Sequence, residues 1–173
     1  MMISCRSTRI VEEAKIKQPN ILLLLSDDQS FNTINALGNK EVSTPNMDRL
    51  VSEGTTFTHA HIMGGNTGAI CMPSRAMMMT GKNVQKFNNQ GALTSEDETM
   101  PQLLKEAGYA TFGTGKWHNN RDSYARSFTH GSNIFLGGMS NHLKVPLHDF
   151  DPSGEYLKRN RRFEDKFSSV LFR

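Results

Sequence analysis

The stretch CMPSRAMMMTGK, residues 71–82, predicts a helix with a reactive cysteine at its start. Cys71 stands directly before a Pro-Ser-Arg sequence, and a short apolar run follows. Proline fits the first turn of a helix, and Gly81 is the kind of residue at which a helix ends. A thiol at a helix start beside Arg75 lies where its anionic form is favoured. We therefore expect a helix from about Pro73 to Thr80, next to a cysteine that does chemistry.

An acidic pair follows the most apolar stretch of the chain. Residues 21–25 read ILLLL, and continuous apolarity of this kind is typical of a strand covered on both faces of a parallel sheet. Asp27 and Asp28 come directly after it, where open α/β sheets place their ligands. Two adjacent carboxylates are costly without a cation, and their oxygens suit Ca²⁺ or Mg²⁺. For the pair taken alone, an acidic loop that caps the next helix is the alternative interpretation.

Capping signals place the other helices, and short apolar runs place the other strands. Thr44 and Pro45 predict a helix start that Gly54 ends, and Thr99 predicts the cap of a second helix. Lys116 and His118 then follow an apolar stretch, which again puts polar groups at the end of a strand. The expected helix and strands cover Met100–Ala107, Thr55–Ala60, Tyr109–Gly113 and Ile134–Met139.

Stretches at residues 19–28, 71–82 and 108–118 resemble the sulfatase family, in its order and roughly its spacing. Cys-x-Pro-Ser-Arg followed by Thr-Gly-Lys, at residues 71–82, resembles the signature of that family, without gaps. TPNMDRLVSEGTTF at 44–57 and EAGYATFGTGKWH at 106–118 resemble its flanking segments. The resemblance spans about residues 18–139. It implies an alkaline-phosphatase-like α/β fold, a mostly parallel sheet flanked by helices.

The resemblance also implies a domain organisation. Residues 1–17 are expected to be a flexible lead-in, and residues 18–173 the N-terminal part of a catalytic domain. Sulfatases are much longer, and their later metal ligands and smaller C-terminal domain have no match here. We therefore expect a truncated catalytic domain, which as an isolated chain would be inactive for want of the later site residues.

In the sulfatase family the cysteine of the signature is oxidised to formylglycine. The resemblance therefore implies that Cys71 is the modified residue and that a formylglycine-generating enzyme is a transient partner. A hydrated formylglycine carries two hydroxyl groups on one carbon: one attacks sulfur, and the second lets the aldehyde re-form and expel sulfate. Arg75 would hold the hydrated aldehyde and offset charge, and Lys82 would support it.

The resemblance assigns the remaining site residues to metal and sulfate. Asp27, Asp28 and the residue formed from Cys71 would bind Ca²⁺, with Mg²⁺ less favoured, as a Lewis acid on a sulfate oxygen. Lys116 and His118 would bind the sulfate. The implied substrate is a sulfated small molecule or a sulfated carbohydrate. The alternatives are a phosphonate or phosphodiester hydrolase of the same superfamily, and a non-catalytic fragment that binds anions.

Composition limits the partners. The formal net charge of the 173 residues is +3 and the basic residues are mostly scattered, which does not indicate a nucleic-acid partner. The longest pure apolar run is far too short to span a bilayer.

The N-terminus lacks the apolar segment of a signal peptide, so the sequence as written predicts a cytoplasmic protein. A periplasmic or secreted protein is expected if the true N-terminus is missing.

Overall fold

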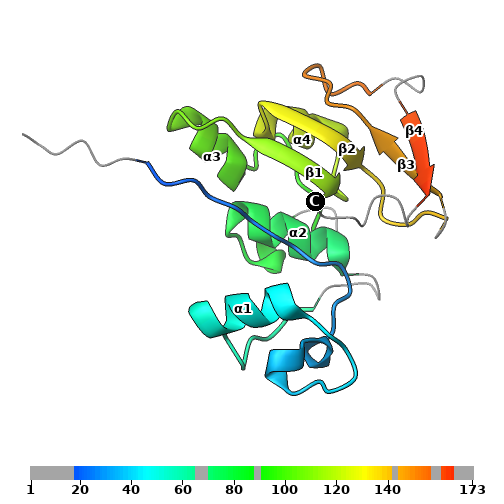
Figure 1. Ribbon diagram of the computed structural model, residues 1–173. Coiled ribbons are helices and arrows are strands. Elements are labelled where there is room, and N and C mark those ends of the chain that lie inside the picture. The colour runs from blue at the N-terminus through cyan, green and yellow to red at the C-terminus, as the bar shows by residue number, and fades with distance from the viewer. Residues whose placement is uncertain (1–17, 65–69, 88–90, 142–143, 157–160, 166–173) are drawn as a thin grey trace, which may run out of the picture. The chain divides into compact units, whose positions relative to one another are not determined.

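The computed structural model describes residues 18–64, 70–87, 91–141, 144–156 and 161–165 (Figure 1). The chain divides into two compact units, residues 1–55 and 56–173. The flexible lead-in predicted for residues 1–17 lies outside the described residues.

The first unit contains the helix predicted from Thr44 and Pro45. Helix α1 spans Pro45–Glu53 and Gly54 follows it, as expected. The hydroxyl of Thr44 does not cap the helix: its Oγ1 accepts a hydrogen bond from the Asn35 backbone N at 2.9 Å and donates one to Asp48 Oδ1 at 2.8 Å. These bonds fasten α1 to the short 3-10 helix η2, Asn35–Leu37. A second 3-10 helix, η1, covers Phe31–Thr33.

The strand predicted at residues 21–25 is not formed, and this prediction is wrong. A strand exists only through hydrogen bonds to another strand, and the described residues of the first unit contain none. The side chains of this run are largely exposed: Leu22 is 82% and Leu24 64% exposed. The apolar composition of residues 21–25 was therefore not enough to predict a strand.

The second unit combines helices with a four-stranded sheet. The elements in chain order are α2 (Cys71–Thr80), η3 (Val84–Lys86), α3 (Met100–Glu106), β1 (Phe112–Lys116), α4 (Arg121–Ser127), β2 (His130–Phe135), β3 (Lys144–His148) and β4 (Arg161–Asp165). The strands lie in the order β1-β2-β3-β4, with β4 at the outer edge (Figure 1). Helix α3 contacts both α2 and α4.

The fold is α/β as predicted, but the described sheet is mixed rather than mostly parallel. Only β1 and β2 run parallel, with α4 between them in sequence. Strand β2 pairs antiparallel with β3, and β3 antiparallel with β4. Residues 136–143 join β2 to β3, and this connection is shorter than the dozen or so residues that a parallel crossover needs. The length of this connection therefore explains why β2 and β3 run antiparallel.

Local signals predicted the helices better than the strands. Thr99 caps α3 as expected, since its Oγ1 accepts a hydrogen bond from the Gln102 backbone N. The strand predicted at Thr55–Ala60 is absent from the described residues. Those predicted at Tyr109–Gly113 and Ile134–Met139 are shifted by three or four residues to the positions of β1 and β2. No helix among the described residues is long and apolar enough to cross a membrane.

The core of the second unit centres on Tyr124, which lies across a pair of glycines. Gly113 of β1 and Gly131 of β2 are register partners, and a Cβ on either would collide with the Tyr124 hydroxyl. Trp117, 4% exposed, packs edge-on against the Tyr124 ring at 5.5 Å between ring centroids. Burial raises the pKa of the Tyr124 phenol. These contacts fix α4 against β1 and β2, whose ends carry the candidate site.

Candidate active site

Helix α2 begins at Cys71 itself, two residues earlier than predicted. The thiol is free and the residue is half-buried. The helix ends at Gly81, whose φ of 67° lies in the left-handed region that favours glycine. Arg75 stands four residues after Cys71, so the two side chains share one face of α2. A half-buried side chain at a helix start is open both to modification and to a bound anion.

Arg75 connects this helix to the end of β1. Arg75 is only 8% exposed as a residue, and its Nη1 donates a 2.5 Å hydrogen bond to the backbone carbonyl oxygen of Lys116, the last residue of β1. A charged donor in so buried a position makes a stronger hydrogen bond than a neutral one. The bond brings the start of α2 and the end of β1 together. Three of the predicted site residues, Cys71, Arg75 and Lys116, therefore belong to one arrangement.

His118 follows two residues later, beside a glycine that the sequence alone did not identify. Its φ of 54° is in the left-handed region, which breaks the alternation of the strand. A Cβ at Gly138 would overlap Nε2, Cε1 and Cδ2 of the His118 imidazole. The Gly137–Gly138 pair was visible in the sequence, but nothing there showed which side chain approaches it. Gly138 is therefore the residue that leaves room for the His118 ring.

Replacing Gly138 by alanine is expected to displace the His118 imidazole. The added methyl group would overlap the ring, and overpacking of this kind costs about 1–3 kcal/mol. The imidazole signals of His118 in NMR spectra and the thermal unfolding midpoint measure the two effects. Gly137→Ala is the matched control, because the nearest atoms to its Cβ would belong to the Phe135 ring, at 3.1 Å, and to the Met139 carbonyl, at 3.8 Å. An unchanged His118 signal in Gly138→Ala would contradict the prediction.

Lys82 is not brought to Cys71. It follows the C-terminal end of α2, and a ten-residue helix is about 15 Å long. Its Nζ lies 2.6 Å from Oδ1 of Asp97, a residue that the sequence analysis missed and that is 6% exposed. Thr94 donates two hydrogen bonds to Asp97 Oδ2, from its backbone N and from its Oγ1, both at 2.8 Å. Lys82 thus fastens the end of α2 to the loop before α3.

The Asp97 carboxyl predicts an acid-sensitive contribution to stability. Burial raises its pKa, but the hydrogen bonds from Lys82 and Thr94 together outweigh burial, so the folded-state pKa lies below the usual 3.8. The stabilisation is therefore present above about pH 4 and is lost as the pH falls through the lowered folded-state pKa. We expect Asp97→Asn to remove about 1 kcal/mol at pH 7. Denaturant unfolding between pH 7 and pH 2 measures this.

The control for this pH dependence is Glu98→Gln, which neutralises the exposed neighbouring carboxylate. Its stability should fall with acid as in the unchanged protein, whereas Asp97→Asn should show a shallower fall. If the free energy of unfolding fell equally with pH in all three proteins, the stabilising role of the Lys82–Asp97 pair would be contradicted.

The predicted metal ligands form no complete site among the described residues. Asp27 and Asp28 are exposed in the first unit, and Asp28 has a φ of 54°. Their adjacent carboxylates offer the hard oxygen donors that Ca²⁺ prefers. The described ranges contain no group of three His, Cys, Asp or Glu side chains positioned to bind a metal ion. The pair therefore fits part of a cation site, and the metal role of Cys71, in the second unit, stays a prediction.

Comparison with known proteins identifies one family. The family model described as Sulfatase matches residues 19–159. Human N-acetylgalactosamine-6-sulfatase is 31% identical over 81% of this chain and 31% of its own length. Human steryl-sulfatase is 33% identical over 73% of this chain and 24% of its length. An N-acetylglucosamine-6-O-sulfatase of Bacteroides thetaiotaomicron is 33% identical over 67% of this chain and 21% of its length. The chain thus spans about a fifth to a third of these relatives.

Proposed function

This chain belongs to the sulfatase family, and we propose that it forms part of the catalytic domain of a sulfuric ester hydrolase. The single observation that carries the proposal is the hydrogen bond from Arg75 to the Lys116 carbonyl oxygen. It links the cysteine-bearing start of α2 to the strand end that leads to His118. We also propose that the complete domain has the alkaline-phosphatase-like fold.

Cys71 is the proposed site of modification to formylglycine. Its position supports this, because the thiol is free and half-buried at the first residue of α2. The modified residue would supply the nucleophile towards sulfur. Arg75 shares the helix face of Cys71 and brings a fixed positive charge to it. A buried guanidinium held by the Lys116 carbonyl needs little rearrangement when negative charge develops nearby, which is the condition for electrostatic stabilisation.

Lys116 and His118 are the proposed sulfate-binding residues. The Lys116 ammonium would provide a positive charge for a sulfate oxygen, and the His118 imidazole would donate a hydrogen bond to another. Trp117 between them is buried and donates from Nε1 to Ser123 Oγ at 3.0 Å, which anchors the segment. Gly138 sets the position of the His118 ring. We expect each of the two sulfate-binding donors to contribute about 10²–10³ to turnover.

Asp27 and Asp28 are proposed as two ligands of a divalent cation, with Ca²⁺ favoured over Mg²⁺. When bound, such a cation would polarise a sulfate oxygen. Its further ligands would have to come from outside the described residues. Lys82 is proposed to act through stability, by holding the end of α2 to Asp97, rather than by contact with the residue formed from Cys71.

The proposed substrate is a sulfated small molecule or a sulfated carbohydrate. Two of the compared relatives are named for sulfate on an N-acetylated amino sugar and one for a sterol sulfate. All three names refer to a sulfate ester of an organic alcohol. The sulfate group is therefore the shared part of the proposed substrate.

Mass spectrometry of the peptide that contains Cys71 tests this proposal. After co-expression with a formylglycine-generating enzyme, we expect a lower mass by the difference between the CH₂SH side chain and a CHO side chain. Expression without that enzyme should leave the thiol, which serves as the control. A peptide that keeps its thiol mass under co-expression would count against the formylglycine mechanism.

A further inference from the structure

The second unit contains a cavity of about 660 Å³ that borders the segment of His118 on two sides. Its volume falls within the range of about 300–1,000 Å³ that is usual for ligand sites. Asn119, directly after His118, and Gly137, directly before Gly138, both line it. Since Gly138 lies against the His118 imidazole, a sulfate held by His118 would sit at the edge of this cavity. The rest of a sulfated substrate would then extend into it.

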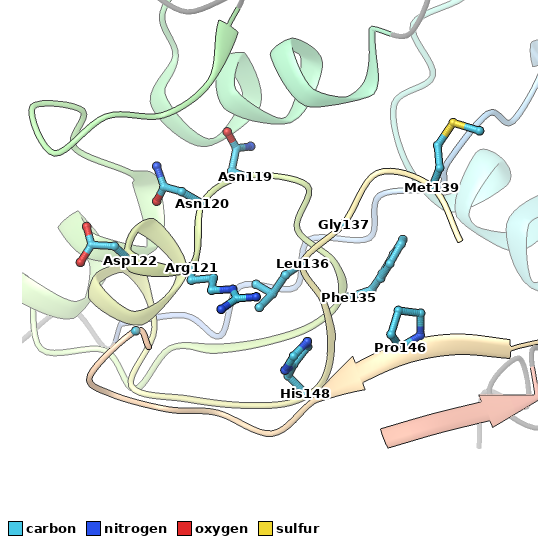
Figure 2. Close-up of a pocket in the computed structure, with 11 residues that line it drawn as sticks. Asn119, Asn120, Arg121, Asp122, Phe135, Leu136, Gly137, Met139, Pro146 and His148 are labelled. Atoms are coloured by element: carbon cyan, nitrogen blue, oxygen red, sulfur yellow. The ribbon is translucent and has the colours of Figure 1, made fainter. Parts of the chain in front are cut away.

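The cavity wall is mainly apolar, with one arginine directed into it. Figure 2 shows the Arg121 side chain extending from α4 towards Leu136 and His148, with Phe135 and Pro146 on the facing side. His148 is 4% exposed, and its ring packs edge-on against Tyr156 at 5.7 Å between centroids. It therefore forms part of the wall. A ring with an apolar face would fit between these side chains.

Arg121 has hydrogen-bonding capacity left for a ligand. Its Nη1 donates to the backbone oxygens of Glu155 at 3.1 Å and Tyr156 at 3.4 Å, which holds the guanidinium in place. Nε and Nη2 make no hydrogen bond within the described residues. A guanidinium fork of this kind matches a carboxylate or a sulfate. The Arg121 guanidinium is thus held in place by Nη1, and its other two nitrogens can bind a ligand.

The other polar side chains of the wall do not compete for this role. Asn119 Oδ1 accepts from the Leu93 backbone N at 3.0 Å, and Asn120 Nδ2 donates to the Leu93 carbonyl at 2.5 Å. Both amides point away from the guanidinium in Figure 2, and so does the carboxylate of Asp122. Arg121 is therefore the charge that a ligand in the cavity would meet.

We propose that this cavity binds the leaving-group side of the substrate and that Arg121 selects a second anionic group there. The substrate class is then a sulfate ester whose ring also carries a carboxylate or a second sulfate. This inference rests on the proposed function, because it takes the first sulfate to be bound at Lys116 and His118.

Calorimetric titration of the full chain, expressed without the formylglycine-generating enzyme so that no turnover occurs, tests the proposal. The probes are 4-carboxyphenyl sulfate, its neutral match 4-carbamoylphenyl sulfate, and 1,4-phenylene disulfate. We expect the carboxylate probe to bind about three- to tenfold more tightly than the amide probe. A similar gain for the disulfate alone would identify a second sulfate, rather than a carboxylate, as the selected group. Equal affinities for all three probes would overturn the inference and leave the proposed function standing.

Variants separate ligand binding from a structural role of Arg121. Arg121→Gln should abolish the preference for the carboxylate probe over the amide probe and leave the affinity for the amide probe unchanged. Arg121→Lys should keep part of that preference. Arg49→Gln is the charge-matched control, since its side chain is 71% exposed in the first unit and pairs with Glu53 on the same helix. An equal loss for all probes in Arg121→Gln would mean a structural role and overturn the inference. Failure of every sulfated probe to bind would overturn this inference, whereas the proposed function stands or falls by the mass of the Cys71 peptide.

Discussion

Replacement of Cys71 by alanine is expected to lower sulfate-ester turnover by about 10⁶-fold, the loss seen when a hydrolase loses its nucleophile. The reason is chemical, because the methyl group of alanine carries no sulfur or oxygen and is not converted to the aldehyde that the mechanism needs. The measurement is turnover of an aryl sulfate by a protein that contains the complete catalytic domain, co-expressed with the modifying enzyme. The residual rate reports what binding and electrostatics achieve without the nucleophile.

The matched control is Met78→Ala, which shortens a half-exposed side chain on the same helix. It should retain most of the turnover, and both variants should unfold at temperatures close to that of the unchanged protein. Turnover that survives in Cys71→Ala would remove Cys71 from the mechanism.

Replacement of Arg75 by methionine is expected to lower turnover by about 10²–10³-fold and stability by about 1–3 kcal/mol. Methionine fills a similar volume but provides neither the positive charge nor the donor to the Lys116 carbonyl. The end of β1 would then no longer be held to the start of α2. Steady-state kinetics in the complete domain and denaturant unfolding of this chain measure the two effects.

Arg126→Met distinguishes stability from catalysis. Arg126 also bonds backbone carbonyls, with Nη2 2.6 Å from the Thr94 oxygen and 3.0 Å from the Asp97 oxygen. It lies on α4, away from the first turn of α2 in sequence and in its contacts. We expect this variant to lose stability but to keep its turnover at a temperature where it is folded. Equal kinetic losses in both variants would assign Arg75 a structural role only.

Helix boundaries could be predicted from the sequence because their signals are local. Thr44 with Pro45, Thr99 and Gly81 each mark an end through the chemistry of one or two residues, and α1, α3 and α2 begin or end there. Strands depend on partners far away in the chain. The apolar run at residues 21–25 shows nothing of such partners, and the strand expected there is absent from the structure.

In the candidate site, too, local features could be predicted from the sequence and contacts between distant residues could not. The motif around Cys71 and Arg75 could be predicted because its residues lie on one helix. The contact of Arg75 with the Lys116 carbonyl joins residues far apart in sequence, and only the structure shows it. Asp97 was missed because it lies in a polar stretch that resembles any surface loop. Gly138 was missed because the importance of a glycine depends on the side chain that approaches it.

The chain contains a single tryptophan, and Trp117 stands between the two proposed sulfate-binding residues. Its indole is buried, donates to Ser123, and lies edge-on to the rings of Tyr124 and Phe128. Fluorescence excited at wavelengths that tryptophan absorbs and tyrosine does not therefore comes from one known position, next to the site. The substitutions of Arg75 and Gly138, which contact the residues on either side of Trp117, can be followed through that emission without an added dye, because a solvent-exposed indole emits at longer wavelength than a buried one.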